Sequence, residues 1–289
     1  MDVRAFYETC AFPEEAVAVV TAATEKLRAA VDFDAWQARL YGGDSELWQE
    51  LTAIAEQLGI HRFTAHLALL AHCVPEAKRR YAEAGIPEDI YWDSMKDIRF
   101  KMMETHYIHG VWGVYCGQWL SKFLTRDIIC LGRLQFEPVQ AQFACRIGDR
   151  QIDVGDAMLS VHIPSFGKLV YADVLDAYRR AGVFFRDRFP GGEIWLRSVT
   201  WILYPPVHAM LPEGNMRRWA EDYKVVHTKE DPSGTDLYRI FHLPNGTPID
   251  RYPDSNTLQR RLKAWILEGN SMGLGCGYLL LQDGEICRG

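Results

Sequence analysis

Apolar residues in the first 125 or so positions recur at helical spacing. Leu47, Leu51, Ile54 and Leu58 lie three and four residues apart, so one face of a helix beginning at Asp44 is apolar. The same pattern predicts further helices over residues 13–31, 61–73, 75–84 and 88–106. Acidic residues or proline indicate where helices begin, and glycine indicates where they end. Residues 1–125 are therefore predicted to form an all-helical N-terminal domain.

From about residue 126 the pattern changes to short strands mixed with helices. Residues 133–137 (RLQFE) alternate polar and apolar positions, as in a half-buried strand, and Gly148-Asp149 predicts a hairpin turn. The fold class is therefore α+β, with residues 126–289 forming a mixed α/β sheet domain. Further strands are predicted over 151–154, 157–163, 195–204 and 277–282, and helices over 171–189, 215–223 and 256–268.

Two glycine-containing stretches in this half are predicted to be turns. Residues 225–228 and 237–242 are expected to pair as a hairpin around the sequence DPSG at 231–234. The run GLGCG at 273–277 precedes a predicted strand, whereas a dinucleotide-binding loop follows one. It is therefore predicted to be a flexible turn into the last strand.

The composition is that of a globular protein, and the charge limits its partners. Hydrophobic residues make up 48% and charged residues 24% of the 289 positions, and the net charge is -6. Without a basic run the chain lacks the face that nucleic-acid binding needs. No apolar stretch is long enough to cross a bilayer, and the N-terminus does not resemble a signal peptide. Seven widely spaced cysteines predict a reduced, cytoplasmic setting.

Histidines and cysteines offer weaker candidates for chemistry. His106 and His109 lie one helical turn apart with Glu104 nearby, and imidazole and carboxylate are zinc ligands. Ligand types alone do not fix the geometry of a site, so no metal is predicted. Cys130 and Cys145 lie in apolar strands, where a thiol is usually an inert core residue.

The strand predicted over 157–163 leads through a short loop into a helix that begins near Tyr171. This order presents backbone N–H groups and the positive end of the helix dipole to an anion. Gly167 permits a ligand to approach the backbone closely, and Lys168 adds a positive charge. An ordinary strand-to-helix connection has the same outline, so both interpretations stay open at this point.

Short runs in the second half resemble a known family in a shared order. Together with GIP at 85–87 they resemble bacterial acyltransferase domain-containing proteins, which pair an N-acyltransferase N-terminal helical domain with a GNAT-like C-terminal domain. The runs are LGRLQFE at 131–137, VHIP at 161–164, FF at 184–185, FP at 189–190, WILYP at 201–205, LPEGNM at 211–216 and NTLQR at 256–260.

The resemblance implies an acyl-CoA-dependent N-acyltransferase that acts on a small molecule. Acetyl-CoA or another acyl-CoA would be the cosubstrate, and no cofactor would be tightly bound. In GNAT enzymes the CoA pyrophosphate binds where the fourth strand meets the next helix, and the strand backbone binds the thioester carbonyl. The positions implied here are Val161, Ile163, Ser165, Phe166, Gly167 and Lys168.

Acyl transfer to an amine needs a general base, because the amine loses a proton as it attacks the thioester. His162 is the first choice, since imidazole titrates near neutral pH. Glu137, on a neighbouring predicted strand, is the second. Tyr223, at the end of a predicted helix, is a candidate acid for the leaving thiolate.

Two other functions stay open from the sequence. The loop has one glycine, Gly167, where the GNAT phosphate loop usually has two, which fits a non-catalytic module that binds a small molecule or a protein. The nine tryptophans and thirteen tyrosines are suited to line such a site. A metal-dependent hydrolase that uses His106 and His109 as metal ligands is a third, minor alternative. The acyl group, the acceptor and a homodimer are left undetermined.

Overall fold

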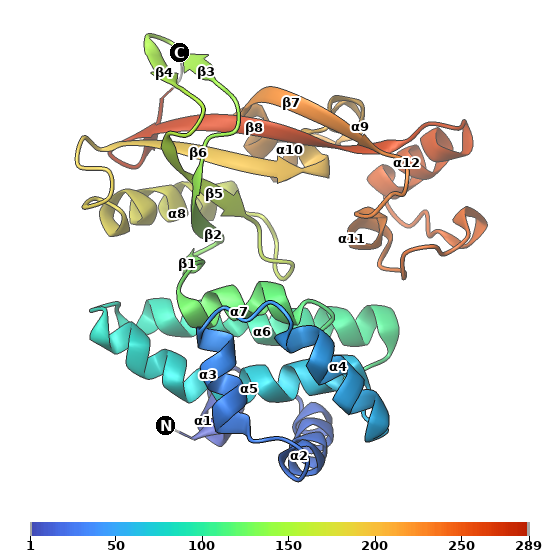
Figure 1. The fold of residues 1–289 in the computed structure, drawn as a ribbon. Helices are drawn as coiled ribbons and strands as arrows, with labels where there is room; N and C mark the ends of the chain where they lie inside the picture. Colours follow the sequence, from blue (N-terminus) through green and yellow to red (C-terminus); the bar gives the residue numbers. More distant parts are fainter. Residues whose placement is uncertain (1, 288–289) are drawn as a thin grey trace. The chain divides into compact units, whose positions relative to one another are not determined.

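The chain divides into two compact units in its computed structural model, which describes residues 2–287 (Figure 1). A helical unit comprises the chain up to Cys130 together with Pro164–Phe166, and a sheet unit comprises Leu131–Ile163 and the residues from Gly167 onward. The predicted fold class, helices followed by a mixed sheet domain, is confirmed. One segment departs from a simple division at residue 126, because Pro164–Phe166 belongs to the helical unit although it follows a strand of the sheet.

The helical unit is organised around its fifth helix. From Thr64 to Val74 all residues of this helix except His72 are buried, since other helices of the unit pack around it. None of the helices in residues 2–287 is long and apolar enough to cross a membrane. The helices are α1 (Val3–Thr9), α2 (Glu14–Arg28), α3 (Phe33–Tyr41), α4 (Leu47–Gln57), α5 (Arg62–Glu83), α6 (Glu88–His109) and α7 (Gly117–Thr125).

The predicted break before Pro75 is wrong, because α5 continues through this proline. Proline removes one hydrogen bond from a helix and crowds the preceding turn. Two tyrosine hydroxyls donate to carbonyls beside it, Tyr41 to Cys73 at 3.0 Å and Tyr91 to Val74 at 3.1 Å. Tertiary contacts therefore bind the helix at the two residues that precede its proline.

The sheet unit contains a seven-stranded mixed sheet with the order β1-β2-β5-β6-β8-β7, and β9 pairs with β8. β5 and β6 are parallel, whereas β2/β5, β6/β8 and β7/β8 are antiparallel. β3 and β4 form a separate hairpin. The strands are β1 (Ile129–Leu131), β2 (Leu134–Gln140), β3 (Cys145–Ile147), β4 (Arg150–Ile152), β5 (Ala157–His162), β6 (Glu193–Thr200), β7 (Lys224–Asp231), β8 (Met272–Gln282) and β9 (Glu285–Ile286).

The two faces of this sheet are covered differently (Figure 1). α8 (Tyr171–Phe184) packs on one face against β2 and β8. The β3–β4 hairpin packs on the other face, where Tyr278 and Trp195 belong to a buried cluster with Cys145. The Tyr278 hydroxyl accepts the backbone N–H groups of residues 142 and 143, which ties the approach to the hairpin to β8. The remaining helices are α9 (Pro205–Met210), α10 (Asn215–Glu221), α11 (Leu237–Phe241) and α12 (Thr257–Leu267), with short 3₁₀ turns at Trp201–Leu203 and Ile249–Arg251.

The predicted hairpin of residues 225–228 with 237–242 is wrong. β7 pairs along its length with β8, and residues 237–241 form α11. The Asp231 carboxylate accepts the Thr235 backbone N–H at 2.7 Å, which turns the chain toward this helix. The predicted strand over 195–204 also ends early, because the Thr200 hydroxyl caps the 3₁₀ turn that follows β6.

The glycine run 273–277 lies inside β8 and is not the predicted turn. A Cβ atom added at Gly275 would lie 2.1 Å from the carbonyl oxygen of Leu203, and one at Gly273 would lie 2.6 Å from the Tyr204 ring. At Gly277 it would meet Leu203 and Tyr223. These glycines therefore allow the segment after β6 to pack directly on the strand backbone.

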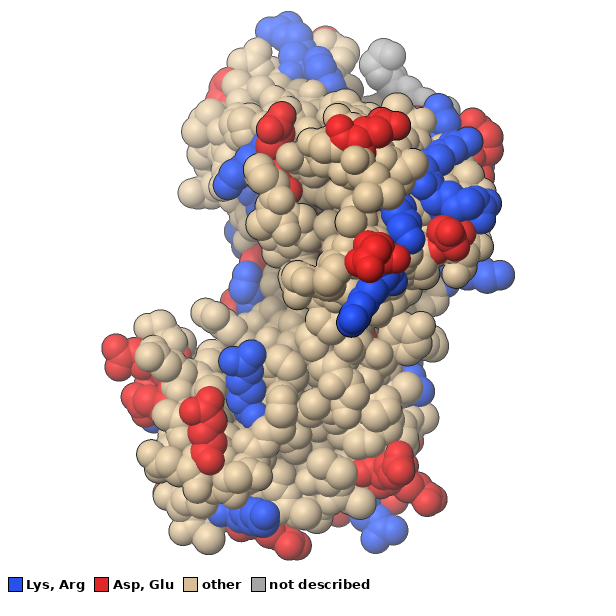
Figure 2. All heavy atoms as spheres, turned by 90° about the vertical axis from the view of Figure 1, so that its right-hand side faces the viewer, with Lys and Arg blue, Asp and Glu red and all other residues tan. Residues whose placement is uncertain are grey.

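Charged side chains of both signs occur on the face of the molecule drawn in Figure 2, and most of that face is neither acidic nor basic. This distribution accords with the net charge of -6.

Candidate active site

His162 and Glu137 lie side by side at the carboxyl end of β5. β2 and β5 are antiparallel, and Gln135 pairs with His162 while Glu137 pairs with Ser160. His162 and Glu137 are therefore diagonal neighbours on one face of the sheet. The His162 Nε2 atom lies 3.0 Å from a Glu137 carboxylate oxygen, and the two side chains are 26% and 16% exposed. The two candidate bases are thus one hydrogen-bonded pair.

The hydrogen bond assigns the imidazole tautomer. An ionised carboxylate only accepts hydrogen bonds, so Nε2 of His162 carries a proton and donates it to Glu137. The Nδ1 atom of the neutral ring is then the one with a lone pair that can accept a proton.

β5 and β6 separate beside this pair. Their parallel pairing is limited to Leu159 with Leu196 and Ser160 with Arg197. One residue further on, the Ser198 hydroxyl donates to the Val161 carbonyl at 3.4 Å, where a backbone bond would otherwise stand. The Ser160–Arg197 pair is therefore the last backbone pair of the two strands, and their separation begins at Val161.

Arg133, a residue of the sheet unit, holds the loop between β5 and α8 by two hydrogen bonds. The Arg133 Nε and Nη2 atoms donate to the carbonyls of Lys168 and Gly167, each at 3.0 Å. Gly167 has φ +86, a backbone conformation that favours glycine. In a trans peptide the carbonyl and the next N–H point in opposite directions, so the N–H groups of Lys168 and Leu169 point away from Arg133. Val170 at the N-cap of α8 has no side-chain acceptor for the first N–H groups of that helix.

The predicted binding residues are divided between the two units. Val161 is buried and Ile163 half-buried, while Gly167 and Lys168 are exposed in the sheet unit. Ser165 and Phe166 belong to the helical unit. A direct contact of these residues with CoA stays a prediction.

Within the helical unit, Ser165 joins a polar network on α6. Its hydroxyl contacts the Lys101 ammonium and lies 3.1 Å from a Glu104 oxygen, which also accepts the Tyr115 hydroxyl at 3.1 Å. The Phe166 ring stacks on Phe100, with centroids 4.9 Å apart. The segment Pro164–Phe166 is thus held on α6, a contact that the sequence pattern did not predict.

Tyr223 lies in the core of the sheet unit. Its hydroxyl is 3.1 Å from that of Tyr178, which accepts the Trp219 indole N–H at 3.1 Å. Burial raises the pKa of the Tyr223 hydroxyl well above its usual value. The structure brings His162 and Glu137 together, whereas the hydrogen-bond partner of Tyr223 lies inside the core. The role of Tyr223 as an acid stays a prediction.

The weaker candidates have other surroundings. The His106 ring stacks on Trp112 with centroids 3.5 Å apart, and the His109 ring lies 5.5 Å from that of Phe63. Within residues 2–287 no three His, Cys, Asp or Glu side chains are grouped as a metal site would need. Burial raises the pKa of the Cys145 thiol, which makes the reactive thiolate scarcer.

The comparisons with known proteins agree with this layout. Residues 1–125 match the family model of the N-acyltransferase N-terminal domain, and residues 128–279 match that of the GNAT-like C-terminal domain. No curated protein matches the chain.

Several solved structures share the whole architecture. An acyltransferase mutant in complex with octanoyl-CoA is 21% identical, with a TM-score of 0.75 over 96% of this chain and 87% of that one. An acyltransferase in complex with decanoyl-CoA and teicoplanin is 23% identical, with a TM-score of 0.72 over the same shares. An acyltransferase in complex with CoA and 10C-teicoplanin is 20% identical, with a TM-score of 0.68 over 96% of this chain and 99% of that one. At these identities the likeness establishes the fold.

Proposed function

The chain belongs to the GNAT-like C-terminal domain family, with an N-acyltransferase N-terminal domain before it, and from this we propose that it is an acyl-CoA-dependent N-acyltransferase. The observation that carries the proposal is the hydrogen-bonded pair of His162 and Glu137, placed where β5 parts from β6. The end of a separated strand, a base and a candidate anion loop then follow one another along a short stretch of chain.

His162 is proposed to take the proton of the attacking amine. The amine nitrogen forms a bond to the thioester carbonyl carbon while Nδ1 of His162 accepts its proton, and Glu137 holds the ring through Nε2. The carbonyl oxygen, as it becomes negative, is proposed to be bound by the backbone of β5 near Val161 to Ile163, because the last β5–β6 pair lies at Ser160. Collapse of this intermediate breaks the carbon–sulfur bond and releases the CoA thiolate.

The loop from Ile163 to Lys168 is proposed to bind the CoA pyrophosphate. Support comes from the N–H groups of Lys168 and Leu169, which Arg133 turns away from itself, and from the uncapped start of α8. This arrangement does not require a second glycine, because the position with a positive φ in the loop is already a glycine, Gly167. CoA acts here as a cosubstrate that supplies the acyl group.

Arg133 is expected to control the affinity for acyl-CoA. Arg133→Met removes two charge-assisted hydrogen bonds to the loop, so KM should rise by roughly 10-fold or more while kcat changes little. Arg133→Lys should restore part of the affinity, since lysine keeps a charged donor but lacks the planar guanidinium that can bond two carbonyls at once. Steady-state kinetics with a saturating acceptor measure both constants.

The matched control for this variant is Arg150→Met, which removes an exposed arginine of β4 that contacts Glu193. It should leave both constants unchanged. An unchanged KM in Arg133→Met would show that the loop does not depend on this clamp.

Turnover itself tests the proposed function. The purified protein is incubated with acetyl-, octanoyl- or decanoyl-CoA and an amine acceptor, and the released thiol is measured. Teicoplanin, present with decanoyl-CoA in one similar structure, is a first acceptor to try. Acceptor-dependent thiol release is the expected result. Calorimetric binding of acyl-CoA without turnover would instead favour a binding module, and no binding at all would contradict a CoA site.

Two further properties are proposed on narrower grounds. A cytoplasmic location is supported by the seven cysteines, all of which are free thiols in the structure. A homodimer stays a prediction.

A further inference from the structure

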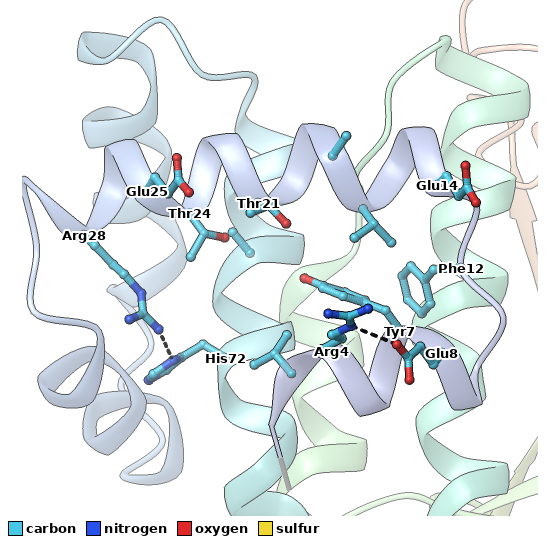
Figure 3. Close-up of a pocket in the computed structure, with 14 residues that line it drawn as sticks. Arg4, Tyr7, Glu8, Phe12, Glu14, Thr21, Thr24, Glu25, Arg28 and His72 are labelled. Atoms are coloured by element: carbon cyan, nitrogen blue, oxygen red, sulfur yellow. Dashed lines mark hydrogen bonds and ion pairs between the residues drawn. The ribbon is translucent and has the colours of Figure 1, made fainter.

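A groove lies in the helical unit between α1, α2 and α5, and its volume is about 800 Å³ (Figure 3). All the residues that line it belong to the helical unit and lie outside the proposed acyl-CoA loop. Its lining is mainly apolar and includes Val3, Tyr7, Phe12, Val17 and Ala68. Apolar pockets with a few convergent polar groups are the usual form of a small-molecule site.

The groove follows α2 along its length. Its lining extends from Glu14 at one end of this helix to Arg28 at the other. With a rise of 1.5 Å per residue, this stretch is about 21 Å long. A lipid acyl chain occupies half of a bilayer core about 30 Å thick, so a fatty acyl chain fits within the groove.

One end of the groove carries a cation without an opposing carboxylate. Among residues 2–287 Arg28 makes no ion pair, and its Nη2 atom lies 3.2 Å from Nδ1 of His72. His72 Nε2 lies 3.2 Å from the Asp34 carboxylate, so Nε2 donates and Nδ1 accepts from Arg28. Burial and the charge of Arg28 lower the pKa of His72, which keeps this ring neutral. The side-chain hydrogen-bond partner of Arg28 at this end is therefore a neutral ring, with the Asp34 carboxylate behind it.

Among residues 2–287 the groove has four other charged lining residues, of which Arg4 and Glu8 form an ion pair and Glu14 and Glu25 do not. Arg4 lies 2.9 Å from Glu8 across one helical turn. Figure 3 shows Glu25 on the side of α2 opposite to Arg28 and His72, and Glu14 at the far end of the helix. An anion in the groove would accordingly find its opposite charge at Arg28.

Two hydroxyls face the middle of the groove. Within residues 2–287 the side-chain hydroxyls of Tyr7 and Thr21 have no hydrogen-bond partner, and Figure 3 shows both directed into the space between α1 and α2. Thr21 is exposed, so its hydroxyl keeps water as a partner beside a bound apolar chain.

We propose that this groove binds a free fatty acid, with its carboxylate on Arg28 and its chain between α1 and α2. Arginine binds carboxylates through paired charge-assisted hydrogen bonds, which a neutral alcohol cannot reproduce. The apolar lining takes the chain out of water. The site is independent of the proposed acyl transfer, because it shares no residue with the loop or with His162 and Glu137.

Calorimetry on the full chain tests this site with dodecanoate and dodecanol as probes. Saturating decanoyl-CoA is present throughout, so that the proposed acyl-CoA site is occupied. Dodecanoate should bind with one-to-one stoichiometry and at least about 10-fold more tightly than dodecanol. Arg28→Met should weaken dodecanoate binding by a similar factor and leave dodecanol binding unchanged. Lys26→Met, an exposed residue of α2 outside the groove, is the control.

A second variant guards against a folding artefact. Thr21→Trp fills the middle of the groove and should weaken both probes, with an unchanged unfolding midpoint. Equal binding of acid and alcohol, an unaffected Arg28→Met variant, or no binding of dodecanoate would overturn the proposal. Dodecanoate binding that appears only when decanoyl-CoA is omitted would assign the probe to the acyl-CoA site and would also overturn the proposal. So would binding that occurs only with lipid vesicles.

Discussion

Replacing His162 with alanine is expected to lower kcat/KM by about 10²–10⁴-fold, the usual contribution of a positioned general base. The amine must lose its proton as the new bond forms, and Nδ1 of His162 is the proposed acceptor. Binding of acyl-CoA, measured by calorimetry, should persist, because the loop and Arg133 are unchanged. The loss should therefore appear mainly in kcat.

Glu137→Gln refines this test. The glutamine oxygen can still accept the Nε2–H of His162, so the ring keeps its tautomer but loses the neighbouring negative charge. A smaller fall in kcat, roughly 10-fold, is expected because the imidazolium is less stabilised. His227→Ala, on the exposed strand β7, is the matched control and should be fully active. Wild-type turnover in His162→Ala would exclude this residue as the base.

Gly275→Val is expected to destabilise the sheet unit by about 3 kcal/mol or more, the upper part of the range for overpacked cores. A Cβ atom there lies 2.1 Å from the Leu203 carbonyl oxygen and 2.3 Å from its carbon. These are backbone atoms of the 3₁₀ turn that follows β6, so they cannot move aside as a flexible side chain would. The melting temperature should fall by roughly 6 °C or more, which circular dichroism can follow.

Gly191→Ala is the matched control for this substitution. Nothing lies within 4 Å of a Cβ atom at Gly191, and its φ lies outside the range that disfavours other residues. Its free energy of unfolding should stay within about 0.5 kcal/mol of the wild type. Equal melting temperatures for both variants would mean that the turn can shift away from β8.

Local patterns predicted much of the fold, because the period of apolar residues is set by neighbours along the chain. The strand that ends at His162, the loop with Gly167 and the helix from Tyr171 were all expected, and the structure contains them. Residues 237–242 were misassigned, since a short apolar run suits a strand or a helix equally.

The candidate site was predicted as separate residues and assembled only by the sheet. His162 and Glu137 were alternatives in the sequence, and the register of β2 against β5 makes them partners. Arg133 stood in a run noted as a strand and for its family resemblance. Nothing local shows that its side chain reaches a loop about 35 residues further on.

The sequence by itself determined the helical first half, the mixed second half and the order of strand, loop and helix that suits an anion. Only the tertiary structure decided that α5 continues through Pro75 and that the 3₁₀ turn containing Leu203 packs on the glycines of β8. It also decided that Arg133 holds the loop between β5 and α8. The physical reason is the range of the interactions. Periodicity and capping act within a few residues, whereas these three features depend on groups that strand register and packing bring together from distant positions.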